Sequence, residues 1–240
     1  EVGSSIPGTD SVIYFFSPVT WVITEEALNV GEDFGDPIYL PDGNGISYET
    51  TVNIQAFDAV AILDDDDFVE ICVEMEHSYL GDLDMSLTSP NGTTVVLFNT
   101  FGSGAGGTYL GDPIDDFGDG PNDPSGECWE YCWSIEPQFG TFPNSIGNTM
   151  LAPIASGNSM IPGSYTPEGD FSNFEGSSAN GVWTLTVTDN IGNDNGFICA
   201  WGLTMNVVGE QDEVIVDSLV PEILSYGWYC AEEPSSIVTF

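Results

Sequence analysis

Aspartate clusters are the part of this sequence with the clearest potential for chemistry. The densest cluster, in a glycine-containing stretch, consists of Asp112, Asp115, Asp116 and Asp119. Ca²⁺ takes about six to eight oxygen ligands from carboxylates, amides and backbone carbonyls, and a loop of this composition can surround one ion. Asp82, at the start of an expected strand, could complete the site. We therefore predict that Ca²⁺ binds and orders the loop from Asp112 to Asp119.

Two further groups of oxygen ligands have the same character. One lies around an expected turn before Gly196 and consists of Asp189, Asn193, Asp194 and Asn195, and the other is the run Asp64–Asp67. Exposed acidic loops are often only solvated. However, 39 acidic residues without any Lys or Arg give a formal net charge of -39, and this self-repulsion disfavours a compact state unless cations collect. We therefore expect at least one bound cation, with Asp189 and Asp194 as further candidate ligands.

The absence of Lys and Arg also excludes classes of partner. Binding to nucleic acid depends on basic side chains that neutralise phosphates, and anionic membrane surfaces attract basic segments. No apolar run is long enough to span a bilayer. We therefore predict neither nucleic-acid binding nor membrane insertion. A chain without Lys or Arg offers no cleavage site to trypsin-like proteases, and we interpret the composition as protease resistance combined with cation-dependent assembly.

The only histidine, His77, is not accompanied by the other residues of an active site. Histidine suits proton transfer near neutral pH, but no serine-protease nucleophile motif is present. We predict a structural hydrogen bond for His77 and no enzymatic activity. A glycosidase would need one pair of carboxylates, and nothing in the sequence singles out such a pair.

Five cysteines can be either buried small residues or, in an oxidising compartment, disulfide partners. They are Cys72, Cys128, Cys132, Cys199 and Cys230, and their spacing fits no common zinc motif. In a secreted chain four of them can form two disulfides. Cys128 and Cys132 flank a short segment and are one candidate pair, with Cys230 as the candidate for the residue left over. The connectivity stays open.

Short runs of alternating apolar and polar residues predict the elements that would position these groups. Leu83, Met85 and Leu87 alternate with polar residues, and the turn sequence 89–92 follows, which is typical of a hairpin. The strand around Trp183 has the same period, and residues 197–205 carry apolar side chains, Trp201 among them, at every second position. Half-buried antiparallel sheets have this pattern. We predict an all-β antiparallel sandwich in which Trp183 and Trp201 are structural.

The chain divides into three predicted zones. Residues 1–36 contain an N-terminal strand segment, residues 37–209 the β-sandwich, and residues 210–240 an acidic linker with a C-terminal strand segment. The apolar stretches near the two ends, Val12–Phe16 and Ile237–Phe240, are typical of edge strands that await a partner.

Several phrases of the central zone occur together in one known family. They are Glu76–Leu83, Thr88–Thr93, Asn180–Asp189, Gly196 and Trp201–Leu203. In this order they resemble the P domain (Homo B domain) that follows the catalytic domain of subtilisin-like proprotein convertases, over roughly residues 37–208. The resemblance implies a jelly-roll β-sandwich of about eight strands.

Within that family the chain is most similar to P-like modules of very large, type IX-secreted surface proteins of gliding bacteria. The phrases Tyr39–Gly43, Gly107–Pro113 and Pro162–Tyr165 carry this similarity. It implies an extracellular or cell-surface location. Ser11 and Ser218 each follow an aspartate in a motif similar to the O-glycosylation motif of these bacteria.

Together these features predict a noncatalytic, Ca²⁺-assisted structural or adhesive module. Its apolar ends favour head-to-tail self-association into a fibre, or contact with neighbouring modules of the same protein. One alternative is an accessory P domain of a secreted subtilisin-like protease. Another is a carbohydrate-binding module in which Trp129, Tyr131 and Trp133 stack on surface glycans.

Overall fold

A computed structural model describes residues 28–43, 45–57, 60–64, 67–114, 124–192 and 194–206. The sequence features that lie outside these residues are the terminal apolar segments, Cys230, Asn193, the serines Ser11 and Ser218, and the aspartates Asp65, Asp66, Asp115, Asp116 and Asp119. Among the described residues, no helix is long and apolar enough to cross a membrane.

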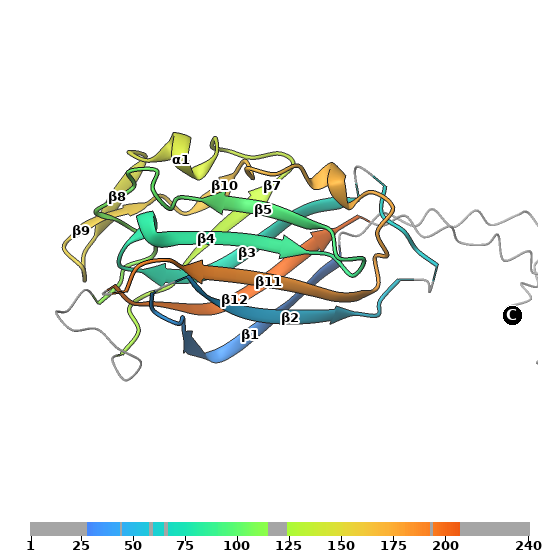
Figure 1. The fold of residues 1–240 in the computed structure, drawn as a ribbon, viewed down its shortest axis with the longest axis horizontal. Coiled ribbons are helices and arrows are strands. Elements are labelled where there is room, and N and C mark those ends of the chain that lie inside the picture. The colour runs from blue at the N-terminus through green and yellow to red at the C-terminus, as the bar shows by residue number, and fades with distance from the viewer. Residues whose placement is uncertain are drawn as a thin grey trace, which may run out of the picture. The chain divides into compact units, whose positions relative to one another are not determined.

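The larger sheet has five strands in the order β1-β12-β3-β7-β10 (Figure 1). Its members are β1 (Leu28–Tyr39), β12 (Gly196–Met205), β3 (Phe68–His77), β7 (Trp129–Ser134) and β10 (Gly163–Tyr165). All neighbours are antiparallel except β10, which pairs with β7 in parallel. Because β1 starts at Leu28, residues ahead of position 37 already belong to this sheet.

The second sheet has four antiparallel strands in the order β2-β11-β4-β5. They are β2 (Ile46–Ile54), β11 (Gly181–Asp189), β4 (Leu83–Thr88) and β5 (Thr94–Asn99). Consecutive strands such as β1 and β2, or β11 and β12, lie in different sheets, so the chain crosses repeatedly between the two layers, as in a jelly roll. The predicted all-β sandwich is confirmed.

A small sheet and three short helices complete the described part of the fold. The sheet has the order β6-β9-β8; its strands are β6 (Thr108–Tyr109), β8 (Thr149–Ala152) and β9 (Gly157–Met160). The helices are the 3-10 turns η1 (Leu80–Asp82) and η2 (Phe171–Phe174) and the single-turn α1 (Phe142–Ser145).

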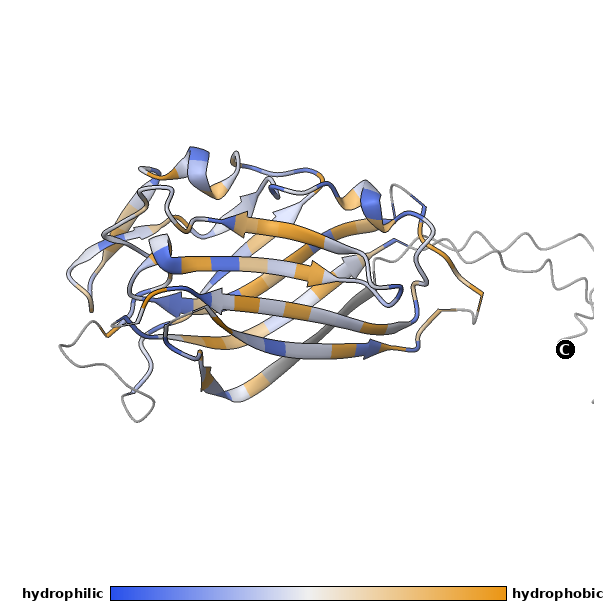
Figure 2. Ribbon diagram, viewed as in Figure 1, coloured by the Kyte–Doolittle hydropathy of each residue, from blue (hydrophilic) through white to orange (hydrophobic). Residues whose placement is uncertain are grey.

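The core lies between the two main sheets because each strand turns alternate side chains inward. Figure 2 shows the resulting bands of hydrophobic and hydrophilic residues along the strands of the four-stranded sheet. The two predicted structural tryptophans are both in this core, Trp183 fully buried and Trp201 3% exposed. Trp183 packs against Phe68 and Phe174 with ring centroids 5.6 and 5.1 Å away. Each indole N–H donates a hydrogen bond, Trp183 to Ala179 O and Trp201 to Thr50 Oγ1, both at 3.3 Å.

The predicted hairpin between β4 and β5 is confirmed. Its turn is closed by hydrogen bonds from Gly92 N to Ser89 O and from Ser89 N to Thr93 O, each 2.9 Å long. Gly92 has a φ of 88°, a left-handed conformation that glycine adopts without steric cost.

Strand β12 departs from the predicted one-sided pattern. A bulge between Ile198 and Ala200 shifts its register against β3. The bulge reverses the facing of side chains, so Ile198 is fully buried together with Trp201, while Cys199 is only partly buried. The prediction that Phe197 and Cys199 share the face of Trp201 is therefore wrong, because one inserted residue breaks the period of two.

Two disulfides join strands or loops that are distant in sequence. They link Cys72 to Cys132 and Cys128 to Cys199. The candidate pair Cys128 and Cys132 is wrong for a geometric reason. The two residues are four positions apart along extended chain, about 13 Å at 3.3 Å per residue, whereas a disulfide requires Cα atoms within about 7 Å.

Candidate functional site

Carboxylates and amides from four separate segments meet at one end of the sandwich. Asp189 ends β11 and pairs with both Leu83 and Ile46, the first residues of β4 and β2. Asp82, in η1, precedes Leu83, and its backbone oxygen accepts hydrogen bonds from Asn190 N and Nδ2, both 2.9 Å. The topology therefore brings the start of two strands and the end of a third to the same place.

His77, the last residue of β3, lies beneath these carboxylates and is fully buried. Its Nδ1 accepts a hydrogen bond of 3.0 Å from Tyr79 N. Because an acceptor nitrogen carries no proton, the neutral ring has its proton on Nε2. Nε2 lies 3.4 Å from Asp189 Oδ2, which is a close contact but not a hydrogen bond, since Nε2 has no hydrogen-bond partner among the described residues.

Glycine at position 196 makes this arrangement possible. Gly196 pairs with His77 across β12 and β3, and a Cβ atom there would lie 2.2 Å from His77 Cδ2. Any other residue at this position would displace the imidazole ring. The Gly196 in the sequence is thus explained by the packing of His77.

Asp82 and Asp189 are both buried, with 3% and 2% of their surface exposed. Asp189 Oδ1 accepts a hydrogen bond of 3.1 Å from Ile191 N, and its Oδ2 lies 3.4 Å from His77 Nε2. Asp82 has no such support, since no described residue donates a hydrogen bond to its carboxylate. Burial, followed by the nearby charges of Asp189 and Asp194, raises the pKa of Asp82 from 3.8 to about 6.

Asp42, on the loop between β1 and β2, is a fourth acid in this group that the sequence did not single out. Its charge adds to the increase in the pKa of Asp82, which His77 partly offsets. Asp42 is brought close by two glycines, because a Cβ on Gly43 would be 2.6 Å from the Cα of Gly192. That contact brings the loop after β1 against the loop after β11. We call Asp42, Asp82, Asp189 and Asp194 the Asp82 cluster.

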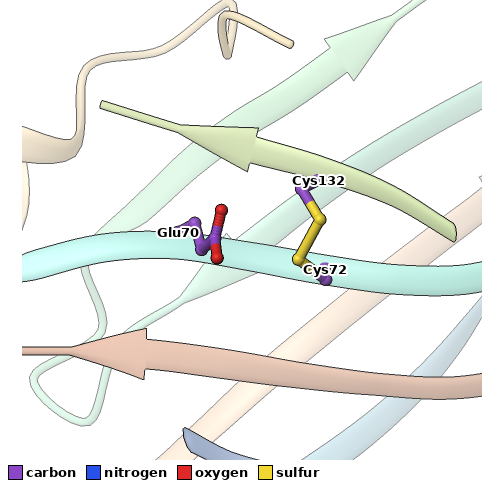
Figure 3. A group of neighbouring side chains, drawn as sticks. All are labelled: Glu70, Cys72 and Cys132. Atoms are coloured by element: carbon purple, nitrogen blue, oxygen red, sulfur yellow. A yellow bond between two sulfur atoms is a disulfide. The ribbon is translucent and has the colours of Figure 1, made fainter. Parts of the chain in front are cut away.

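The chemistry available to the Asp82 cluster is that of oxygen ligands for a hard cation. However, no three of its carboxylates place their oxygen atoms within 4.8 Å of one another. Among the described residues, only Glu70, Cys72 and Cys132 place three ligand atoms within 4.8 Å of one another. Figure 3 shows that the two sulfurs of this trio are joined in a disulfide, so they are not available as metal ligands.

The structure groups Asp82 with Asp189 and Asp194, whereas Asp112 is engaged elsewhere. The Asp112 carboxylate is 1% exposed and accepts hydrogen bonds of 2.9 to 3.0 Å from Ile154 N and Ala155 N. It thereby stabilises the turn between β8 and β9. Because residues 115–119 lie outside the described part, the Ca²⁺ site predicted in that loop stays a prediction.

The aromatic residues proposed to stack on sugars are not available for that purpose. Tyr131 and Trp133 are fully buried on the inner face of β7, and only Trp129 is partly exposed. Tyr131 donates to Met160 O over 3.1 Å and accepts from Gly111 N over 2.8 Å. The prediction that these rings form an exposed sugar platform is wrong, because the period of two turns Trp129, Tyr131 and Trp133 toward the core.

These features define a β-sandwich module with a buried histidine and a cluster of carboxylates at one end. Residues 67–112 and 157–205 match the sequence profile of the proprotein convertase P-domain, which supports the resemblance to that family. The matched segments contain His77, Asp82, Asp189 and Asp194.

Two solved structures are similar over part of their length. The complex of Aeromonas sobria serine protease (ASP) with the chaperone ORF2 is 16% identical with a TM-score of 0.36, over 75% of this chain and 27% of the matched chain. The serine protease of Aeromonas sobria is 15% identical with a TM-score of 0.27, over 69% of this chain and 27% of the protease. The chain thus spans far less than the whole of either protein. No curated protein matches the chain.

Proposed function

We propose that this chain is a noncatalytic, cation-stabilised β-sandwich module of a secreted or surface-exposed protein. The Asp82 cluster is the observation that carries this proposal. It places a buried, unsupported carboxylate among three others, in a chain with no Lys or Arg to neutralise them. Ca²⁺ is the proposed counter-ion, because it accepts carboxylate, amide and carbonyl oxygens in flexible geometry.

The noncatalytic part of the proposal is supported by the surroundings of His77. A general base must reach its substrate directly or through one water, but this ring is fully buried. Its two nitrogens face Tyr79 N and Asp189. The hydroxyl of the adjacent Ser78 donates to Asn195 O over 3.2 Å and is therefore not oriented as a nucleophile toward the imidazole.

An extracellular location is supported by the two disulfides, which persist in oxidising compartments. We propose a structural or adhesive role, with head-to-tail self-association or contact with neighbouring modules. Display on a surface by the type IX route belongs to the same proposal. An accessory P domain of a secreted subtilisin-like protease is the second candidate, and it is favoured by the family match. A catalytic Asp-His-Ser domain in the same polypeptide would decide for the second candidate.

The assembly of the native protein tests the structural role. We expect threads or chains of particles by electron microscopy in the presence of Ca²⁺, and separate particles after chelation. A matched measurement with Mg²⁺ distinguishes a specific site from general screening of charge. Separate particles under all three conditions, with unchanged sedimentation, would exclude assembly by this chain.

A further inference from the structure

A trough runs across the outer face of the five-stranded sheet, on the side opposite the core. It has a volume of about 410 Å³ and is lined by residues of β3, β7 and β12. Its rim carries the carboxylates Glu70, Glu74 and Glu130. The Asp82 cluster includes none of these residues, and the proposed cation site does not depend on them.

Strand register explains the shape of this trough. Gly202 of β12 pairs with Cys72 on one side and with Gly31 of β1 on the other, and Ala200 pairs with Glu74. Paired residues share a face of the sheet, so the floor consists of backbone and a methyl group. The disulfide between Cys72 and Cys132 forms one wall, and Figure 3 shows Glu70 beside it.

The charges around the trough are left unbalanced by the rest of the chain. Glu74 lies directly opposite Glu130 on the neighbouring strand, and like charges in such a pair repel. Glu70 is half-buried, and burial followed by the charge of Glu130 raises its pKa. The absence of Lys and Arg from the sequence means that no such side chain within these 240 residues can relieve the repulsion.

The spacing of the carboxylates favours an elongated cation over a single metal ion. Glu70 and Glu74 are four residues apart on one strand, so their Cα atoms are about 13 Å apart at 3.3 Å per residue. Glu74 and Glu130 do not belong to the only group of three ligand atoms within 4.8 Å among the described residues. Arg and Lys side chains combine an apolar stem, which can lie over glycine and sulfur, with a charged head that carboxylates bind.

We propose that the trough formed by Glu70, Glu74, Glu130 and the Cys72–Cys132 disulfide is a docking site for a basic segment of a different protein or domain. An Arg or Lys stem lies over the Gly202 floor, and its cationic head lies between the carboxylates. A second copy of this chain cannot supply that side chain, since the sequence contains neither residue. The trough therefore mediates contact with a different partner and not self-association.

A peptide titration of the complete chain tests this proposal. The probe is a blocked pentapeptide, Gly-Arg-Gly-Arg-Gly, and its control is the same peptide with citrulline, which keeps the shape and removes the charge. We expect the amide NMR signals of Glu70, Glu74 and Gly202 to shift with the arginine peptide only. Because the protein is strongly acidic, binding in the trough must also be distinguished from nonspecific electrostatic attraction of the cationic peptide.

Two variants and one control make that separation. Glu70→Gln with Glu130→Gln should weaken peptide binding about tenfold, which corresponds to about 1.4 kcal/mol. Glu49→Gln with Glu136→Gln removes the same charge at exposed positions outside the trough and should change the affinity less than about twofold. Ala200→Leu keeps every carboxylate and fills the floor, and it should weaken binding as strongly as the double variant in the trough.

Three results would overturn the proposal. Equal loss of affinity in the trough variant and in the control variant would show general electrostatic attraction. Retained affinity in Ala200→Leu would show that the trough itself is not occupied. If CaCl₂ alone shifts the same amide signals saturably, and Ca²⁺ competes with the peptide for a single site, the trough is a metal site. It would then not be a site for a basic side chain. Thermal melting of each variant checks that the fold is retained.

Discussion

Replacing Asp82 by Asn should have opposite consequences with and without Ca²⁺. In the folded protein the ionised carboxylate of Asp82 is buried close to Asp189 and Asp194, and its pKa is raised from 3.8 to about 6. The folded state therefore holds a proton that the unfolded chain releases at lower pH. Each pKa unit corresponds to about 1.4 kcal/mol, so the ionised group destabilises the fold by at most about 3 kcal/mol, and screening by solvent reduces this to about 2 kcal/mol.

The sign of the effect follows from linkage. Below pH 3.8 Asp82 is protonated in both states, and the variant should have nearly the stability of the original protein. As the pH rises from about 4 to about 6, the original protein loses stability that Asp82→Asn retains. Above that range the difference is complete. For a domain of this size, about 2 kcal/mol corresponds to a rise in melting temperature of roughly 4 to 8 °C.

Calcium should reverse the order of the two proteins. A ligand at about one hundred times its dissociation constant stabilises the folded state by about 2.7 kcal/mol, and Asp82→Asn lacks one of the proposed ligands. Melting curves at pH 4 and pH 7.5, with chelator and with CaCl₂, measure both the destabilisation by the ionised Asp82 and the stabilisation by Ca²⁺. If the variant is less stable than the original protein in chelator at pH 7.5, repulsion within the Asp82 cluster is not the dominant effect. An equal rise on adding CaCl₂ in both proteins would exclude Asp82 as a ligand.

Three further substitutions test other parts of the structure. Asp112→Asn should lower the free energy of unfolding by about 2 to 3 kcal/mol, because it weakens the hydrogen bonds from Ile154 and Ala155. If the variant shows the same rise in melting temperature with Ca²⁺ as the original protein, Asp112 does not contribute to Ca²⁺ binding. Tyr131→Phe should cost about 1 to 3 kcal/mol in urea unfolding, since Gly111 N–H and Met160 O lose their buried partner. No loss of stability would mean that water replaces the hydroxyl in the variant. Removing the Cys72–Cys132 disulfide, which spans 60 residues, should cost about 4 kcal/mol by loop-closure entropy, and a loss below about 1 kcal/mol would show that the unfolded state is not restrained by it.

The fold could be predicted because its signals are local. Alternation at Leu83, Met85 and Leu87 fixes which face of β4 is buried, and the turn before Thr93 fixes the partner strand. By contrast, the bulge at Cys199 could not be predicted, because the alternation of apolar residues in the sequence continues through it. The disulfide partners were also beyond reach, because Cys72 and Cys132 become neighbours only through the pairing of β3 with β7.

For the candidate site too, the sequence indicates which residue types matter but not which of them lie close together. The sequence predicted Asp82, Asp189 and Asp194 as candidate oxygen ligands, because a chain of this composition needs counter-ions. It grouped Asp189 with Asp194 but assigned Asp82 to the Asp112 loop, because the place of Asp82 depends on the pairing of Leu83 with Asp189. Asp42 was missed for a similar reason, because only the close approach of Gly43 to Gly192 brings its loop to the others.

Calorimetric titration of Ca²⁺ into the metal-free protein is the most direct test of a cation bound at the Asp82 cluster. The original chain should bind at least one ion saturably at physiological ionic strength, and Asp82→Asn with Asp194→Asn should lose that ion. Glu49→Gln with Glu136→Gln, which removes the same charge elsewhere, should retain it. Identical titrations for all three proteins, or no saturable binding to the original chain, would contradict the account.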